Sequence, residues 1–242
     1  MPLSGPARVL VLVDQPLVAR TIVLTLNHGV CVTREAEDVP AATAVLEAWQ
    51  PHLAILDMDI GGDLLVGGMT RSDEGSQTRI PVLALTRRGD LQTKLAAFEQ
   101  GVDDIMTIPF SPEELLARVL VITRRTYGAS DRFIPTIRLG ELEIDILHRK
   151  VRAGTSELPL TGLEQSLLYL LAANAGRMVT RDEILDALWG VDYAAESNVV
   201  DRHVRNLRAK LQNDWRKPRF IATVPGKGYR FVPVFSEPDS NS

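Results

Sequence analysis

The sequence predicts two domains of different fold class: a doubly wound α/β domain with a (βα)5 parallel sheet, then an α+β domain that begins with an antiparallel sheet. Between residues 8 and 125, short apolar runs alternate with segments of helical period, which is typical of successive βα units. After residue 135, short alternating runs precede three helical segments. We therefore place the first domain at 1–125, a linker at 126–135, the second domain at 136–234 and a disordered tail at 235–242.

In the first domain, apolar runs that stop at polar or proline residues predict strands. These strands are Val9–Val13, Leu53–Leu56, Val82–Leu85 and Ile105–Ile108. Helical periodicity predicts helices at Gln15–Asn27, Val39–Trp49, Leu91–Gln100 and Pro112–Arg125. Ser111 is the expected N-cap of the last helix, with Glu114 three residues on. The segment Gly61–Arg79 contains five glycines, so we expect the remaining helix to be short or distorted.

In the second domain, the alternating runs predict an antiparallel meander. Its strands are Ile137–Leu139, Leu142–Ile146, Lys150–Ala153 and Glu157–Leu160. Two Thr-x-x-Glu capping boxes begin the next two helices, and they are Thr161 with Glu164 and Thr180 with Glu183. We expect these helices to end near Gly176 and Gly190. A third helix is predicted at Glu196–Gln212, and Phe220–Val232 is predicted to form a hairpin that turns at 226–228.

The composition is that of an ordinary globular protein. Hydrophobic residues make up 45% and charged residues 24%, which argues against a disordered chain. No apolar run approaches the roughly 20 residues of a membrane-spanning helix, and no secretory signal precedes the first strand. We therefore expect a cytoplasmic protein with no membrane partner. The single cysteine, Cys31, excludes an internal disulfide and a cysteine-based zinc cluster.

The net charge of −4 is unevenly distributed along the chain. Residues 1–123 contain 9 Lys and Arg against 16 Asp and Glu, a net −7. Residues 197–230 contain 9 basic and 2 acidic side chains, a net +7. A basic segment on an acidic carrier is typical of proteins that bind nucleic acid.

The predicted helix Glu196–Gln212 is amphipathic and has a basic outer face. At about 100° per residue, its apolar stripe consists of Val200, Val204, Leu207 and Leu211. The opposite side carries Asn198, Arg202, Arg205 and Asn206, and the flanks carry His203, Arg208 and Lys210. Arg and Asn have the bidentate geometry that reads guanine and adenine edges, so the pattern indicates a DNA-reading helix. A solvated basic face is the simpler alternative.

The second domain resembles the winged-helix effector domain of OmpR/PhoB-type response regulators over Thr136–Pro233. The matching stretches are LTGLEQSLLYLLAANAGRMVTRDEILDALWG in the first two helices, VVDRHVRNLRAKL in the recognition helix and TVPGKGYRF in the wing. The resemblance implies base contacts by Asn198, Arg202 and Asn206. It implies contacts with the sugar-phosphate backbone by Trp189, His203, Arg205, Arg208, Thr223 and Tyr229.

The same resemblance implies partners. Proteins of this family bind direct-repeat DNA as dimers, and the loop Val191–Glu196 is similar to their contact surface for RNA polymerase. One position departs from the family pattern, because Pro225 stands where the family often has an arginine for the minor groove. Lys227 and Arg230 are the candidates to replace that arginine.

The first domain resembles a receiver domain, which has the flavodoxin-like form of the doubly wound fold, over 8–125. Asp57 ends a buried strand, where open α/β sheets place their ligands. By the resemblance Asp57 is the phosphoacceptor, Asp59 offers a backbone carbonyl to a metal and Thr86 is the switch hydroxyl. The stretch GVDDIMTIPFSPEELLARV also follows the family pattern.

Three positions of this receiver depart from the pattern. Only Asp14 remains of two adjacent acids, since the first is Val13; Ile108 replaces a lysine and Ile105 an aromatic switch residue. With Asp14, Asp57 and Asp59 as the remaining ligands, we expect weakened Mg²⁺ binding and no required cofactor. We expect an output that does not depend on phosphorylation. The alternative is conventional phosphorylation of Asp57, by a sensor histidine kinase, that activates dimerisation.

The resemblance further implies a symmetric dimer face with ion pairs between subunits. Lys94 with Glu114, and Asp104 with Arg118, stand at the matching positions. We expect Ile105 to be exposed on this face and to hold it ready for dimerisation.

Two other function classes remain open. LAILDMDI resembles the Asp-x-Asp motif of haloacid-dehalogenase-type phosphatases, with Asp57 as nucleophile and Asp59 as general acid. That enzyme would need a lysine at a later strand end, where this chain has Ile108. The other class is a DNA-binding module whose altered receiver senses a small molecule or a partner protein. We expect the protein not to be an enzyme.

Overall fold

A computed structural model describes residues 6–27, 31–70, 79–128, 136–146, 148–190, 198–212 and 216–232. Contacts divide the chain into two compact units, 1–133 and 134–242, and each is described by itself. The predicted tail at 235–242, the predicted polymerase-contacting loop Val191–Glu196 and most of the predicted linker lie outside the described residues.

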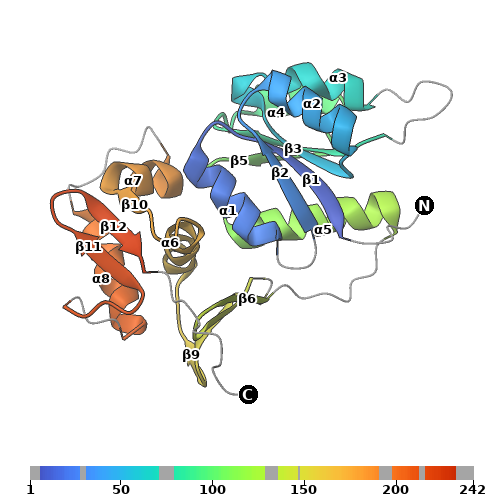
Figure 1. Cartoon of the computed structure of the whole chain (residues 1–242). Helices are drawn as coiled ribbons and strands as arrows, with labels where there is room; N and C mark the ends of the chain where they lie inside the picture. The colour runs from blue at the N-terminus through green and yellow to red at the C-terminus, as the bar shows by residue number, and fades with distance from the viewer. Residues whose placement is uncertain are drawn as a thin grey trace. The chain divides into compact units, whose positions relative to one another are not determined.

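The first unit is built on a sheet of five parallel strands in the order β2-β1-β3-β4-β5 (Figure 1). The strands are β1 Ala7–Leu12, β2 Cys31–Ala36, β3 Leu53–Asp57, β4 Val82–Thr86 and β5 Asp104–Thr107. β3 and β4 are buried at every residue, as expected of strands covered on both faces. The predicted doubly wound sheet is confirmed.

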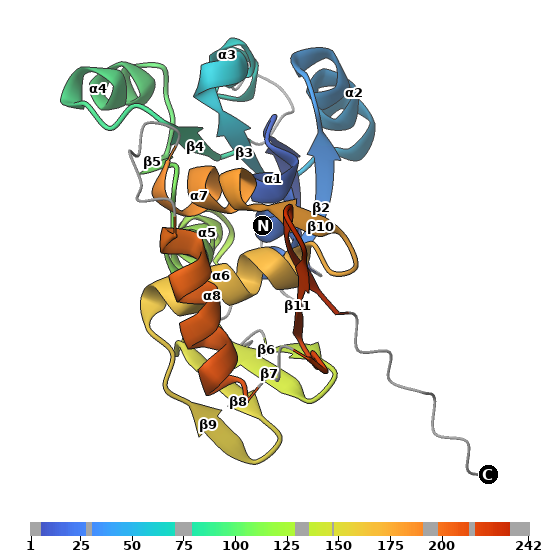
Figure 2. The same cartoon turned by 90° about the vertical axis from the view of Figure 1, so that its left-hand side faces the viewer.

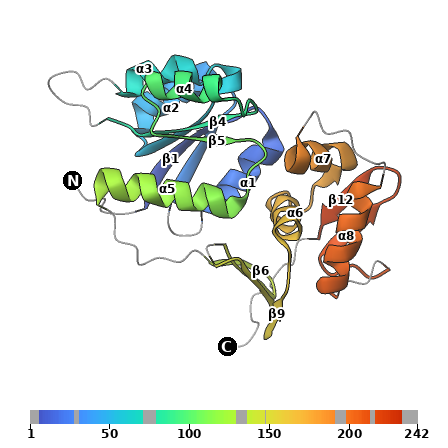
Figure 3. The same ribbon diagram turned by 180° about the vertical axis from the view of Figure 1, so that it is seen from behind.

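Helices cover both faces of this sheet. They are α1 Pro16–Leu26, α2 Val39–Trp49, α3 Asp63–Thr70, α4 Leu91–Glu99 and α5 Pro112–Tyr127. α1 and α5 lie together on one face, and α2, α3 and α4 lie on the other (Figures 1 and 3). α5 runs two residues beyond the predicted end, and Gly128 closes it in the left-handed region with φ +63°.

Local sequence accounts for the ends of these helices. The side chains of Asp38, Asp90 and Ser111 accept a hydrogen bond from a backbone N–H in the first turn of α2, α4 and α5. The third helix is short, as predicted, with eight residues after a 3₁₀ turn, η1, at Met58–Ile60. Gly62 lies between them, and a Cβ there would come within 2.6 Å of the Asp57 carbonyl oxygen.

Strand β2 has no signal in the sequence pattern. Its sequence, CVTREA, has adjacent charges at Arg34 and Glu35 and no apolar run. β2 pairs with β1 alone and forms one edge of the sheet, so its middle residues are not enclosed on both sides. An edge strand therefore lacks the signal that identified the central strands.

The second unit begins with a four-stranded antiparallel sheet (Figure 2). Its strands are β6 Thr136–Leu139, β7 Leu142–Asp145, β8 Lys150–Ala153 and β9 Ser156–Leu158, which confirms the predicted meander. A second sheet has the order β10-β12-β11, with β10 Met178–Thr180, β11 Ile221–Val224 and β12 Gly228–Phe231. The predicted hairpin is β11 and β12, whereas the three-residue β10 was not predicted.

Three helices pack together in this unit: α6 Gly162–Ala173, α7 Arg181–Trp189 and α8 Val199–Lys210. Both predicted capping boxes are present, at Thr161 and Thr180. α6 ends three residues before Gly176. α8 is shorter than predicted at both ends: Asn198 is its N-cap, and Gln212 has φ +52°, which a helix does not continue through. No helix within the described ranges is both long and apolar enough to cross a membrane.

Candidate nucleic-acid interface and acidic pocket

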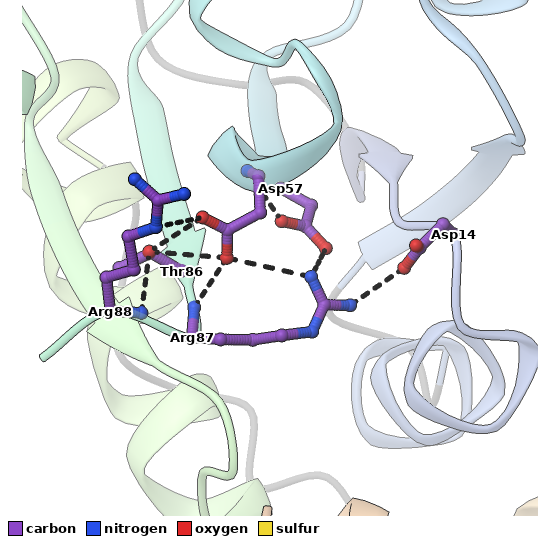
Figure 4. Close-up of polar contacts among 6 residues, drawn as sticks. Asp14, Asp57, Thr86, Arg87 and Arg88 are labelled. Atoms are coloured by element: carbon purple, nitrogen blue, oxygen red, sulfur yellow. Dashed lines mark hydrogen bonds and ion pairs between the residues drawn. The ribbon is translucent and has the colours of Figure 1, made fainter. Parts of the chain in front are cut away.

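Carboxylates from three segments meet at the carboxyl ends of the central strands (Figure 4). Asp57 is the last residue of β3 and fully buried, Asp59 lies in η1, and Asp14 follows β1. Thr86, the last residue of β4, is also buried and lies beside Asp59. The structure thus brings together four of the residues that the sequence placed in a receiver pocket.

The centre of this acidic pocket holds a guanidinium group, that of Arg87, which was not among the predicted site residues. Arg87 Nη2 lies 2.8 Å from Asp14 Oδ1, and Nη1 lies 3.2 Å from Asp57 Oδ2 and 3.6 Å from Asp59 Oδ2. Figure 4 shows the Arg87 side chain extending between Asp57 and Asp14. Its position directly after Thr86 was the available signal, because a strand-end residue next to converging acids reaches the same pocket.

Hydrogen bonds fix the loop that carries this arginine. The backbone N–H of Arg87 donates to Asp59 Oδ2 at 2.7 Å, and the Thr86 hydroxyl donates to the same carboxylate at 3.3 Å. The backbone N–H of Arg88 donates to the Thr86 hydroxyl at 3.0 Å. Asp59 therefore orders the chain after β4 from the opposite side of the pocket.

The ionisable groups of the pocket shift one another's pKa values. Burial raises the pKa of Asp57, although the backbone N–H of Asp59 and the Arg87 charge act in the opposite direction. Burial lowers the pKa of Arg87, but the neighbouring Asp57 and Asp14 outweigh it, so the pKa rises overall. Asp57 Oδ1 accepts a hydrogen bond from Asp59 N–H. Among the residues that the structure describes, Oδ2 has no hydrogen-bond donor and forms an ion pair with Arg87.

The outer face of α8 is polar and open. Its exposed polar side chains are Arg202, Arg205 and Asn206, and Asn198, the residue before the helix, is also exposed. Its buried side chains are Val199, Val200, Val204 and Leu207. The wing between β11 and β12 also exposes Thr223, Lys227 and Arg230. The predicted separation of an apolar stripe from a basic face is confirmed.

Both units match known protein families. Residues 9–120 match the response regulator receiver domain, and residues 155–231 match the C-terminal domain of transcriptional regulatory proteins. The DNA-binding response regulator MtrA of Mycolicibacterium smegmatis is 32% identical over 228 residues, which cover 93% of this chain and 97% of MtrA. The chain belongs to the OmpR/PhoB-type response regulators.

Other relatives of this response regulator also match it over nearly their full length. The transcriptional regulatory protein KdpE of Mycobacterium tuberculosis is 32% identical over 233 residues, which cover 92% of this chain and 98% of KdpE. The alkaline phosphatase synthesis transcriptional regulatory protein PhoP of Bacillus subtilis is 32% identical over 232 residues, covering 92% and 95%. These relatives carry the names of transcription regulators and not of phosphatases.

The three altered receiver positions are buried. Val13 precedes Asp14 in the chain, and the backbone N–H of Ile108 donates to the Thr86 carbonyl oxygen at 2.8 Å. The two residues expose 4% and 8% of their surface. Ile105 was expected to be exposed, and this expectation is wrong, since it is 8% exposed. It belongs to the same hydrophobic cluster as Ala97 of α4 and Val102, so it is a core residue and does not lie on the surface of β5.

Three of the residues expected to form ion pairs between receivers, Asp104, Glu114 and Arg118, pair with one another within one chain. Arg118 of α5 bonds to Asp104 at 2.5 Å and to Glu114 at 2.7 Å. Lys94 is partly buried on α4. The same helix exposes three large apolar side chains, Leu91, Leu95 and Phe98, at helical spacing. Ion pairing between subunits stays a prediction.

Three of the residues predicted to contact the sugar-phosphate backbone, Arg208, Thr223 and Tyr229, connect α8 to the wing. Arg208 donates to the carbonyl oxygen of Ile221 and to the Thr223 hydroxyl, both at 2.9 Å. Tyr229 is 4% exposed, and its hydroxyl donates to Asp201 at 2.6 Å. Arg181 donates to the same carboxylate at 2.7 Å. Arg208 and Tyr229 therefore set the angle between helix and wing, and their contact with DNA stays a prediction.

Electrostatics support this connection. Burial raises the pKa of Tyr229 to about 12, so its hydroxyl remains a donor. Burial also raises the pKa of Asp201, but hydrogen bonds from Tyr229 and Arg181 outweigh it and lower the pKa overall. In α8, the centroid of the His203 ring lies 5.4 Å from that of the Trp189 ring at the end of α7. Burial lowers the pKa of His203.

Proposed function

We propose that this response regulator is a sequence-specific DNA-binding transcription regulator. The observation that carries this proposal is the exposed face of α8, where Asn198, Arg202, Arg205 and Asn206 stand opposite a buried apolar stripe. An α-helix fits the major groove of B-DNA, where Arg and Asn read base edges. The printed name of the relative MtrA, a DNA-binding response regulator, supports the same function.

The roles of the exposed residues follow from their positions. Arg202 and Asn206 lie one turn apart and carry the types that read guanine and adenine, so they supply sequence information together with Asn198. Arg205 on the same helix, and Lys227 and Arg230 on the wing, supply positive charge to phosphates.

We further propose that two copies bind direct-repeat DNA. Leu91, Leu95 and Phe98 form an exposed apolar face on α4, and a second receiver is the occupant that this family architecture supports. Asp104, Glu114 and Arg118 lie on the neighbouring β5 and α5, where they fix the register of the two receivers.

The output of the receiver is proposed to be independent of phosphoryl transfer to Asp57. Val13 and Ile108 replace a metal ligand and a phosphate-binding cation by buried alkyl groups, and loss of a charge-assisted hydrogen bond costs about 1.5–3 kcal/mol. Arg87 also pairs with the Asp57 carboxylate, the group that would have to attack phosphorus. Phosphorylation by a sensor histidine kinase is the second candidate, supported by the strand-end position of Asp57 beside Thr86.

Selection from random DNA with the full-length unphosphorylated protein tests the DNA-binding proposal. The expected product is a pair of half-sites in the same orientation, spaced by about one helical turn. Selection of an inverted repeat would contradict the proposed arrangement, and selection of no sequence would contradict sequence-specific binding.

Incubation with acetyl phosphate and Mg²⁺ tests the receiver. We expect no stoichiometric, acid-labile modification by intact-mass spectrometry, with the Asp57→Asn variant as the matched control. A modification of the wild type that is absent from Asp57→Asn would instead support the conventional mechanism.

A further inference from the structure

We infer that Arg87 is the built-in cation of this receiver pocket and takes the place of the divalent metal that the receiver family uses. This inference rests on the proposed independence from phosphorylation and names its physical cause. Arg87 lies outside the motifs by which the chain resembles a receiver.

The acidic pocket does not fit Mg²⁺ as it stands. A magnesium ion needs oxygen ligands at about 2.0–2.1 Å in nearly octahedral geometry. The oxygens that would supply them, Asp14 Oδ1 and Asp57 Oδ2, instead face Arg87 nitrogens at 2.8 and 3.2 Å. Within the described part of the chain, no group of three His, Cys, Asp or Glu residues is arranged to hold a metal ion.

Arg87 meets the requirements of a resident counter-ion. Its backbone is fixed at the end of β4 by the hydrogen bond to Asp59, and its side chain is 24% exposed. A guanidinium stays protonated at all physiological pH values and offers several N–H groups in one plane, so it can serve two carboxylates at once. The chain itself thereby supplies a positive charge between these carboxylates.

The neighbouring arginine makes a matched control. Arg88 has the same charge and follows Arg87 in the chain, but its side chain is 76% exposed and only approaches Asp59, at 3.9 Å. A comparison of Arg87 and Arg88 variants therefore distinguishes the effect of a charge inside the pocket from that of a charge near it. A phosphoryl donor and its metal would have to displace Arg87, whereas Arg88 would not obstruct them.

The test measures binding of Mn²⁺ to the full-length protein by electron paramagnetic resonance, in which bound Mn²⁺ loses the signal of the free ion. We expect the wild type and Arg88→Ala to bind Mn²⁺ so weakly that millimolar concentrations of the ion are needed to detect it. Arg87→Ala should bind it at least roughly tenfold more tightly than the wild type, and Arg87→Ala with Asp57→Asn should lose the ion again. Arg87→Gln, which keeps much of the side-chain volume, should behave as Arg87→Ala and serves if that variant does not fold.

Two results would overturn the inference. One is wild-type protein that binds Mn²⁺ as tightly as the Arg87 variants. The other is folded Arg87→Ala or Arg87→Gln that binds no better than the wild type. A different result would contradict the proposed independence from phosphorylation. In that case acetyl phosphate would modify Asp57 of the wild type, whether or not the Arg87 variants bind Mn²⁺.

Discussion

A double-mutant cycle between Asp57 and Arg87 measures whether their ion pair holds the receiver pocket together. Removing one partner of a buried ion pair costs about 3–5 kcal/mol, because the other charge is left buried and unpaired. Arg87 is 24% and Asp14 is 47% exposed at the side chain, so water recovers part of this cost. We expect Arg87→Ala to reduce the free energy of unfolding of the first unit by about 2–3 kcal/mol.

Asp57→Asn should have the opposite effect. Burial raises the pKa of Asp57, so the ionised carboxylate is less favourable in the folded unit than in the unfolded chain and costs stability above that pKa. An amide keeps an oxygen for the Asp59 N–H and has no charge to desolvate, so we expect a gain of about 1 kcal/mol at neutral pH. The wild type should approach this stability as the pH falls through the pKa of Asp57.

The double variant should be less destabilised than the sum of the single variants predicts, with a coupling of about 1 kcal/mol or more. Native-state hydrogen exchange of amides in β3 and β4 reports the stability of this unit without interference from the other. Arg88→Ala is the control and should change stability by less than about 0.5 kcal/mol. Additive single effects, within about 0.5 kcal/mol, would refute the ion pair.

Three further predictions concern the dimer face and the DNA-binding unit. Leu95→Glu places a charge on the exposed apolar face of α4 and should weaken self-association at least roughly tenfold in sedimentation experiments; unchanged association would remove α4 from the dimer interface. Asp201→Asn loses its ion pair with Arg181 and should destabilise α8 by about 1 kcal/mol after allowance for exposure, as measured by hydrogen exchange. Because these contacts lower the pKa of Asp201, the advantage of the wild type is present at neutral pH and is lost as the pH falls through the folded pKa; a constant difference down to acid pH would argue against them. Arg202→Ala should cost about 1–3 kcal/mol of binding free energy on the selected site and relax the base preference at one position. Lys227→Ala should weaken binding to all sequences and lower the slope of log affinity against log salt concentration by about 1. Equal loss of affinity for specific and non-specific DNA would show that Arg202 does not read a base.

The fold was predictable where burial imposes a pattern. Val82–Leu85 is covered on both faces and is apolar throughout, and the capping boxes at Thr161 and Thr180 mark two helix starts through local hydrogen bonds. The edge strand Cys31–Ala36 and the short strand Met178–Thr180 have no such signal, because pairing with a neighbouring strand, and not their own pattern, defines them.

The pocket was predictable in its carboxylates and not in its cation. Asp57 and Thr86 end buried strands, so their convergence follows from the topology of the sheet. Arg87 lies in a loop, and the direction of its side chain depends on the hydrogen bond between its backbone and Asp59. The burial of Ile105 was also not predicted. Its place at the family's switch position led us to expect an exposed side chain, but packing against the α4 side of the sheet buries it.

The affinity of the unphosphorylated full-length protein for its selected direct repeat, compared with that of Asp57→Asn, tests the central claim most directly. Fluorescence anisotropy at one fixed salt concentration, with and without acetyl phosphate and Mg²⁺, gives the dissociation constants. We predict equal values for both proteins under both conditions, because output does not pass through Asp57. A wild-type affinity that rises roughly tenfold with acetyl phosphate, and does not rise in Asp57→Asn, would contradict the account.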